Sequence, residues 1–178
     1  LGEMGSGGFG VYLLTNGTLI DGDKAAKLAA LDVKGVQVSI EGPEDIHDSI
    51  RGKGSFAAAC RGVSHLVDAG LNVTLNATLS EINADRFGEI AALCSSLGAQ
   101  RLGFSRLVPS GRGSNLVNRM IEPKKVKQIY AEIFSISADG LEIVTGDPVA
   151  SQMRREPGVD DYGSVPVSYT HLTLPTKR

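Results

Sequence analysis

Several features that mark particular classes of protein are scarce in this chain of 178 residues. Its two cysteines, Cys60 and Cys94, stand far apart in helical patterns, which favours small buried thiols over a disulfide or a metal pair. No apolar run approaches the length of a membrane span, and the start lacks the pattern of a signal peptide. The net charge of -2 and the dispersed basic residues point to neither nucleic acid nor an acidic membrane surface. We therefore expect a soluble cytoplasmic protein with no nucleic-acid or membrane partner.

Two predicted strands are polar along one face and apolar along the other, because strand side chains alternate. In the first, one face carries Gln37, Ser39 and Glu41. In the second, one face carries Asn72, Thr74, Asn76 and Thr78. A parallel sheet covered by helices on both faces would instead consist of near-continuous apolar runs. The pattern therefore predicts an α/β protein built as a partial (β/α) barrel, with helices outside and a polar cavity inside.

The rest of the chain alternates strands and helices, as successive β/α units do. We predict strands over 11–15, 35–40, 71–78 and 101–107, with a weaker one over 141–144. We predict helices over 23–31, 55–69, 83–97 and 123–137. Ser55 is a plausible cap of its helix, and Pro123 suits a first helical turn. The pattern stops after Pro148, where a loop or linker is expected.

The glycine-rich segment Gly5–Gly10 matches the G-x-G-x-x-G pattern of dinucleotide sites and of kinase loops. A Rossmann loop follows a strand and opens a helix, whereas this one precedes a strand. The kinase motifs that should follow it are absent from the sequence. The segment is therefore interpreted as a plain connection.

Polar residues gather at the carboxyl ends of four predicted strands, where β/α folds collect their ligand groups. They are Thr15 to Thr18, Ser39 to Pro43, Asn76, and Arg106 with the turn over 109–113. Together they offer hydroxyls, amides, a carboxylate able to hold a ribose diol, and guanidinium groups able to hold a carboxylate. This set predicts a small, polar, zwitterionic ligand with sugar hydroxyls.

At these residues the chain resembles the radical S-adenosylmethionine (SAM) superfamily, particularly members with a C-terminal SPASM domain. The matching segments are YLLTNGTLI over 12–20, VSIEGPEDIHDSIRGKGSF over 38–56, RGVSHLVDAGLNV over 61–73 and FSRLVPSGRG over 104–113. The resemblance implies the third to sixth units of a six-unit barrel, with about four parallel strands. It also implies an oxidoreductase that reduces SAM at a [4Fe-4S] cluster to a 5'-deoxyadenosyl radical for peptide or cofactor-precursor modification. An electron donor such as flavodoxin or ferredoxin is implied as well.

The resemblance also implies roles for individual residues. Thr15, Asn16 and Gly17 would line the SAM cavity, and Ser39 and Glu41 would hold the ribose or the methionyl part. Either Arg51 or Arg61 would pair with the methionyl carboxylate, a choice that the sequence leaves open. Asn76 would make a further polar contact, and Arg106 would lie near the adenosyl group.

The chain departs from the family's pattern in lacking the CxxxCxxC loop that binds the cluster, and Cys60 and Cys94 are too far apart to replace it. We therefore expect an inactive fragment: a partial core over 1–148, a linker over 149–166 towards a missing domain, and a non-native tail over 167–178. That tail resembles translated sequencing-adapter DNA.

Several of these residues also have purely structural interpretations. His47 is expected to be a surface or capping residue, and Glu41 could simply cap the next helix. The alternative function is a β/α module that binds a nucleotide or a phosphorylated metabolite without redox chemistry. A cluster-binding CxxxCxxC loop in the source DNA upstream of the sequence would separate the two.

Overall fold

A computed structural model describes residues 10–109, 111–136 and 141–153. Most of the glycine-rich segment, the part of the expected linker beyond residue 153 and the whole expected tail lie outside these ranges. Within the described ranges, no helix combines the length and the apolar character that a membrane span needs.

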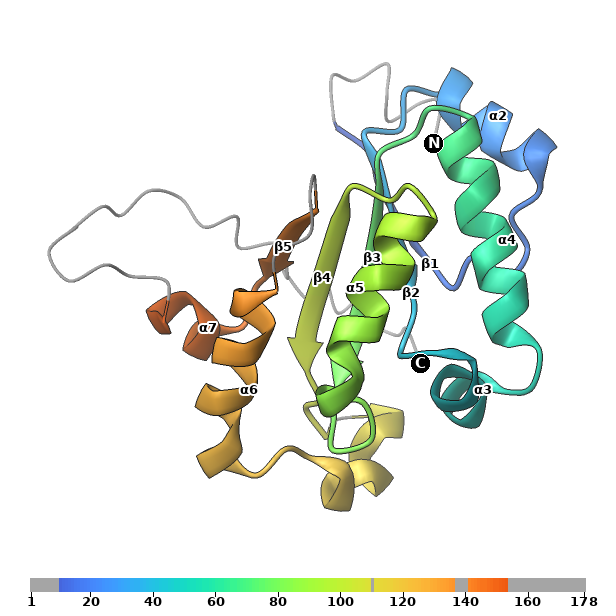
Figure 1. The fold of residues 1–178 in the computed structure, drawn as a ribbon. Helices are drawn as coiled ribbons and strands as arrows, with labels where there is room; N and C mark the ends of the chain where they lie inside the picture. The colour runs from blue at the N-terminus through green and yellow to red at the C-terminus, as the bar shows by residue number, and fades with distance from the viewer. Residues whose placement is uncertain (1–9, 110, 137–140, 154–178) are drawn as a thin grey trace, which may run out of the picture.

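The described residues form one parallel sheet of five strands in the order β1-β2-β3-β4-β5 (Figure 1). The strands are β1 (Tyr12–Thr15), β2 (Gly35–Ser39), β3 (Val73–Leu79), β4 (Arg101–Arg106) and β5 (Glu142–Thr145). The strand over 141–144, which had the weakest sequence pattern, is therefore a full member of the sheet. The predicted α/β class with parallel strands and flanking helices is confirmed.

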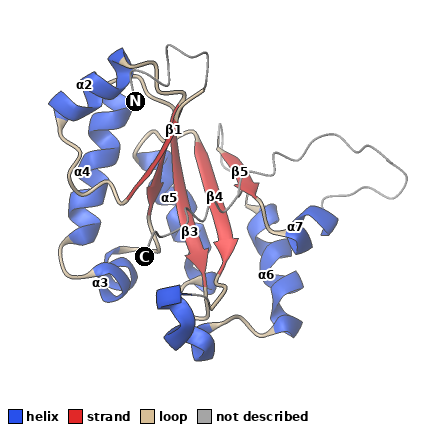
Figure 2. Cartoon of the chain, turned by 180° about the vertical axis from the view of Figure 1, so that it is seen from behind, coloured by secondary structure: helices blue, strands red, loops and turns tan. Residues whose placement is uncertain are grey.

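Helices connect the strands and gather on one side of the sheet. The α-helices are α2 (Gly22–Ala30), α3 (Glu44–Arg51), α4 (Ser55–Asp68), α5 (Phe87–Ser96), α6 (Pro123–Ser135) and α7 (Pro148–Met153). Two 3-10 segments, η1 (Ala84–Arg86) and η2 (Gly111–Arg119), complete the described elements. Seen from behind, the strands lie in front and α5 behind them (Figure 2), so the sheet has one covered face.

Burial follows the predicted alternation most clearly in the central strand β3. Val73, Leu75, Ala77 and Leu79 are buried, whereas Thr74, Asn76 and Thr78 are only half-buried. The register sets Gln37 beside Thr74 and Ser39 beside Asn76, so the polar residues of β2 and β3 form one continuous face. The apolar side chains pack on the helices, as in the contact between Phe104 and Tyr130 of α6, whose ring centroids lie 5.2 Å apart.

Two helix starts differ from the prediction. Ser55 is the first residue of α4 rather than its cap, and Asp48 accepts hydrogen bonds from the Phe56 amide at 2.8 Å and from the Ser55 hydroxyl at 3.2 Å. The helix expected from residue 83 begins as η1 and becomes α-helical at Phe87. The Asn83 side chain does not cap this segment and donates to the carbonyl groups of Glu41 and Thr78 instead.

Two helices were missed. The helix α3 is short and follows Pro43 directly, so it presented too few residues for a periodic pattern, and the prediction that His47 is a surface or capping residue of a loop is wrong. His47 lies in α3 and is 1% exposed. The helix α7 occupies the first residues of the expected linker, and Ala150 within it is fully buried. The folded body therefore continues past residue 148.

Candidate functional site

The turn after β1 is fixed by its own polar side chains. The Thr15 hydroxyl accepts a hydrogen bond from the Gly17 amide at 3.1 Å. Asn16 Oδ1 accepts from the Thr18 amide at 3.2 Å and from the Thr18 hydroxyl at 3.1 Å. These bonds compensate backbone groups that a strand end leaves unpaired. The turn is therefore held in one shape at the carboxyl edge of the sheet.

This turn packs directly on α4 because both partners are glycines. Gly17 has a φ of +75°, a conformation that residues with a side chain rarely adopt. A Cβ atom on Gly62 of α4 would overlap the carbonyl oxygen of Gly17. The turn therefore needs glycine at position 17 for its backbone conformation, and the close contact with α4 needs glycine at position 62.

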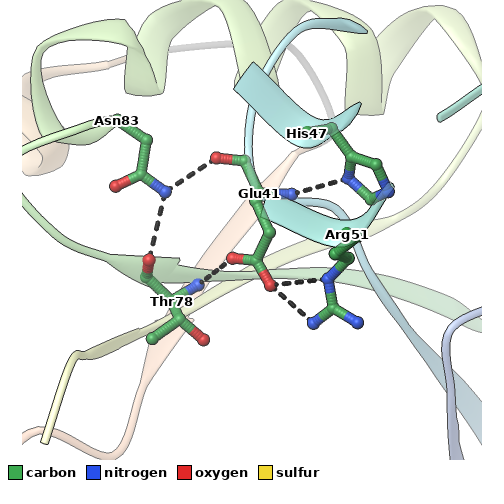
Figure 3. A network of polar contacts seen from close by, with 5 residues as sticks. All are labelled: Glu41, His47, Arg51, Thr78 and Asn83. Atoms are coloured by element: carbon green, nitrogen blue, oxygen red, sulfur yellow. Dashed lines mark hydrogen bonds and ion pairs between the residues drawn. The ribbon is translucent and has the colours of Figure 1, made fainter. Parts of the chain in front are cut away.

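Glu41, the second residue after β2, has a buried side chain whose carboxylate accepts three hydrogen bonds (Figure 3). Its Oε1 accepts from Arg51 Nε at 2.9 Å and from Arg51 Nη2 at 2.5 Å. Its Oε2 accepts from the Thr78 amide at 2.8 Å. Charge-assisted bonds of this kind are stronger than neutral ones. The carboxylate therefore joins α3 to the end of β3.

The backbone of Glu41 is held as firmly as its side chain. Its amide donates to His47 Nδ1 at 3.1 Å. Its carbonyl accepts from Asn83 Nδ2 at 2.7 Å, and the same nitrogen donates to the Thr78 carbonyl at 3.0 Å. Neither His47 nor Asn83 was predicted as a site residue. The signal that could have found Asn83 is its place just after β3, in the row of strand ends that supplied the other candidates.

A pocket of about 310 Å³ lies beside this network, lined by Asn16, Thr18, His47, Arg51 and Ser55. Its volume is at the lower end of the range for small-molecule sites. The lining provides a guanidinium group, an imidazole, an amide and hydroxyl groups. It is therefore suited to part of a polar ligand rather than to an apolar one.

Burial and the nearby Arg51 guanidinium both lower the pKa of His47 from its ordinary value of 6.5. The imidazole is therefore neutral at neutral pH. The pKa of Asp48 is lowered by hydrogen bonds from the backbone amides of Phe56 and Gly54. The loop between α3 and α4 is thus tied to an ionised carboxylate, directly after Arg51, the last residue of α3.

The structure separates the two candidate arginines that the sequence left open. Arg51 lines the pocket and pairs with Glu41. Arg61 is an exposed residue of α4 and does not line this pocket. Ser39 and Asn76 lie side by side on the polar face of the sheet. Gly103 of β4 leaves room for Asn76, since a Cβ there would come within 2.7 Å of Asn76 Oδ1.

Arg106 belongs to a different polar group, which we call the Asp147 cluster: Arg106, Tyr130 and Asp147. Arg106 Nε lies 3.3 Å from Asp147 Oδ2, and the Tyr130 hydroxyl donates to the same oxygen at 2.9 Å. Asp147 Oδ1 accepts from the Val149 amide at 2.8 Å at the start of α7. Arg106 therefore joins β4 to the helices beyond β5, and its contact with a ligand remains a prediction.

The described residues of this chain do not fit an iron-sulfur cluster. Among the described residues, no group of three or more His, Cys, Asp and Glu side chains could hold a metal ion. Cys94 is buried, as predicted, and burial raises its pKa to about 11. Cys60 is half-buried, and burial raises its pKa too. Cluster ligands are thiolates, whereas burial keeps both of these thiols protonated.

The polar donor set, in contrast, fits a small zwitterionic ligand with hydroxyl groups. A parallel sheet with one helix-covered face, and with a pocket at the carboxyl ends of its strands, defines a β/α ligand-binding core. Residues 2–94 match the family model described as the radical SAM superfamily. The chain belongs to the radical SAM superfamily, whose cofactors are S-adenosylmethionine and a [4Fe-4S] cluster.

Curated relatives support this membership. The chain is 37% identical over 141 residues to the mycofactocin maturase MftC of Mycolicibacterium smegmatis, an alignment that covers 78% of this chain and 35% of the relative. It is 34% identical over 124 residues to the AdoMet-dependent heme synthase of Oleidesulfovibrio alaskensis, with coverage of 68% and 32%. The chain thus spans about a third of the length of the curated relatives it matches.

Solved structures share the fold. The structure of Streptococcus suis SuiB bound to S-adenosylmethionine matches with a TM-score of 0.64 and 13% identity, covering 76% of this chain and 32% of that one. Native anSMEcpe with bound AdoMet matches with a TM-score of 0.58 and 22% identity, covering 69% and 35%. At these identities the likeness establishes the architecture of the chain and leaves the roles of its residues to the geometry above.

Proposed function

We propose that this chain forms the SAM-binding part of a radical SAM enzyme that modifies a peptide or a cofactor precursor. The observation that carries the proposal is the buried Glu41 network beside a polar pocket, at the edge of the sheet where this fold binds ligands. The substrate class follows from the relatives, one named a maturase and another a heme synthase. The family match favours this function over a non-redox nucleotide-binding module.

Glu41 retains the capacity to bind a ribose hydroxyl. A carboxylate has about four lone-pair sites. Oε1 accepts two hydrogen bonds and Oε2 accepts one, so one site on Oε2 remains for a ligand. Because the Thr78 amide and Arg51 fix the carboxylate, this lone pair has a defined direction. Ser39 and Asn76 extend the same polar face, and Thr15, Asn16 and Gly17 shape the neighbouring turn.

Arg51 retains capacity for a second ligand group. Its Nε and Nη2 bind Glu41, and no described residue hydrogen-bonds Nη1. A guanidinium group whose Nη1 remains available in a pocket can bind the methionyl carboxylate of SAM. We therefore favour Arg51 over Arg61 for this role.

A [4Fe-4S] cluster, when bound in the whole protein, would supply the electron for the reductive cleavage of SAM. Its thiolate ligands must come from residues other than Cys60 and Cys94. A cytoplasmic flavodoxin or ferredoxin is proposed as the electron donor. Within this chain, the residues described above bind and orient SAM.

Calorimetric titration of the chain with SAM tests the binding site. The wild-type chain should bind SAM, and Glu41→Ala should weaken binding at least tenfold, because a charge-assisted hydrogen bond of about 1.5–3 kcal/mol is lost. Glu142→Ala, which removes an exposed carboxylate at a distant strand, is the matched control. Equal affinity of wild type and Glu41→Ala would remove Glu41 from the site.

A chimera tests the chemistry. This segment replaces the matching segment of the mycofactocin maturase, which then supplies the rest of the protein. The chimera should form 5'-deoxyadenosine from SAM under reducing conditions, and the Glu41→Ala chimera should form far less. A folded chimera that binds its cluster but forms no 5'-deoxyadenosine would contradict the proposed function.

A further inference from the structure

We propose that His47 is a ligand-binding residue of this pocket, whose Nε2–H donates to the same carboxylate that Arg51 binds. The ligand class is an α-amino acid carboxylate, and its identity as part of SAM rests on the proposed function. The inference goes beyond the predicted site, in which His47 had no role.

The hydrogen bond from Glu41 determines where the imidazole proton lies. The Glu41 amide donates to His47 Nδ1 at 3.1 Å, so Nδ1 is an acceptor and carries no proton. A neutral imidazole has one proton, which must then be on Nε2. In Figure 3 the second ring nitrogen lies on the side of the ring away from the Glu41 amide. Nε2–H is therefore a donor, and no described residue accepts its hydrogen bond.

The ring is held in place by its surroundings. His47 is 1% exposed, and its ring lies edge-on to Phe56 with centroids 5.9 Å apart. It nevertheless lines the pocket, together with Arg51 one helical turn further along α3. Among the described residues, no fully buried side-chain nitrogen or oxygen lacks a hydrogen-bond partner, so Nε2, which has none in the protein, is open to the pocket. The pocket is the space in which an acceptor can lie.

The charges around the ring indicate which acceptor fits. Arg51 of α3 provides a positive charge, whereas Glu41 before α3 and Asp48 within it provide negative ones. A phosphate with two negative charges would meet both carboxylates. A carboxylate with one charge can instead lie between the guanidinium group and Nε2–H with less repulsion. The remaining lining groups, from Asn16, Thr18 and Ser55, are uncharged.

Two substitutions separate the roles of the two ring nitrogens. Asn at position 47 places an amide oxygen near the Nδ1 position, so His47→Asn keeps the acceptor for the Glu41 amide and loses the donor in the pocket. Gln places its amide near the Nε2 position, so His47→Gln keeps the donor and loses the acceptor. In calorimetry, His47→Asn should weaken SAM binding about tenfold or more, while His47→Gln weakens it less. Binding of 5'-methylthioadenosine, which lacks the amino acid, should not change in His47→Asn.

Nitrogen NMR of the imidazole groups tests the same inference without relying on affinity. The chain has three histidines, so the signals of His47 are assigned by comparison with His47→Asn. The spectrum should show the Nε2–H tautomer, and both SAM and free L-methionine should shift the Nε2 signal. Three outcomes would overturn the inference: an Nδ1–H tautomer, equal SAM affinity of His47→Asn and wild type, or an Nε2 signal that neither SAM nor L-methionine shifts.

The two proposals fail in different ways. If SAM binds by calorimetry but leaves the Nε2 signal unmoved, the proposed function stands and the role of His47 is wrong. If L-methionine shifts the Nε2 signal but SAM does not bind, the carboxylate pocket stands and the SAM assignment is wrong.

Discussion

Two carboxylates of this protein, Glu41 and Asp147, are alike in position and partner but differ in what surrounds them. Each follows a strand of the sheet, each is nearly buried, and each pairs with an arginine. Glu41 Oε1 accepts from both Nε and Nη2 of Arg51, and the pair lies beside a pocket. Asp147 has a longer contact with Arg106, and its Oδ2, the oxygen that faces Arg106 Nε, also accepts a hydrogen bond from the Tyr130 hydroxyl.

The two carboxylates differ in whether the arginine that each one binds can also bind a ligand. Arg51 ends α3 and lines a pocket, so its pair with Glu41 orients a cation towards a ligand. The Asp147 cluster is closed by helices: Tyr130 of α6 is fully buried, and Asp147 also binds the first turn of α7. Burial and Asp147 together raise the pKa of Tyr130, so its hydroxyl stays a donor. One pair therefore orients a binding group, and the other joins elements of the fold.

Replacing each carboxylate by alanine should give the largest effects and should separate the two regions. Glu41→Ala and Asp147→Ala should each lower the free energy of unfolding by about 3 kcal/mol, since each leaves a partly buried arginine without its partner. Only Glu41→Ala should also weaken SAM binding tenfold or more, whereas Asp147→Ala should change it at most a few-fold, by releasing Arg106. Urea unfolding and calorimetry on both variants measure this. Equal losses of SAM affinity would show that both regions bind the ligand.

Disrupting the contact between the Gly17 turn and α4 should have the next largest effect on stability. Gly62→Ala places a methyl group against the Gly17 carbonyl and should destabilise the chain by about 2 kcal/mol, because backbone must move. Gly88→Ala in α5 is the matched control: nothing lies within 4 Å of its Cβ position. It should stabilise the chain by about 0.5–1 kcal/mol, because alanine favours helix over glycine. Equal changes in the melting temperature of the two variants would contradict close packing between the Gly17 turn and α4.

The comparison also shows what the sequence could predict. Alternation in Val73 to Leu79 gave the polar face and hence the parallel α/β fold, because a strand's side-chain period is independent of its neighbours. Glu41 and Asn16 were predicted because parallel strands place their carboxyl ends at one edge, whereas Arg51 was predicted only from the family resemblance, as an alternative to Arg61. Arg106 was predicted from the same rule, but its partner Asp147 lies 41 residues further along the chain and gave no local signal.

His47 could not be assigned from sequence for a different reason. The short helix α3 spans little more than two turns, too few for a periodic pattern to show which face is buried. The environment of its ring depends on Phe56, which the loop between α3 and α4 brings to it, and on the Glu41 amide, which lies before α3. The fold class can therefore be predicted from local sequence patterns, whereas the protonation of the His47 ring depends on tertiary contacts.

Removing the Tyr130 hydroxyl should have a smaller effect. Tyr130→Phe should lower the free energy of unfolding by about 1 kcal/mol, since Asp147 loses one of its hydrogen bonds but keeps Arg106 and the Val149 amide. Tyr12→Phe, at a position 68% exposed, should be neutral. SAM affinity should be unchanged in both variants. A loss of affinity in Tyr130→Phe would extend the ligand site to the Asp147 cluster.

The smallest effect expected is a dependence on pH. The pKa of His47 is lowered in the folded protein, so on acidification through pH 6.5 the unfolded chain takes up the proton first. Wild-type stability should therefore fall relative to His47→Gln as the pH drops below about 6.5 and should run parallel above it. Urea midpoints measured between pH 8 and pH 5.5 test this; a wild type that gains stability on acidification relative to His47→Gln would show a protonated ring. Tyr130→Phe, measured alongside, should show no such divergence from the wild type.

The spatial order of the strands, which is also their order along the chain, bears on how the molecule is assembled during synthesis. Each strand forms its hydrogen bonds with the one made just before it, so no later segment has to insert between two earlier ones. The sheet can therefore form during synthesis by adding one β/α unit at a time to a single edge. Pausing of translation within a connecting helix would leave a shorter sheet that is already correctly paired.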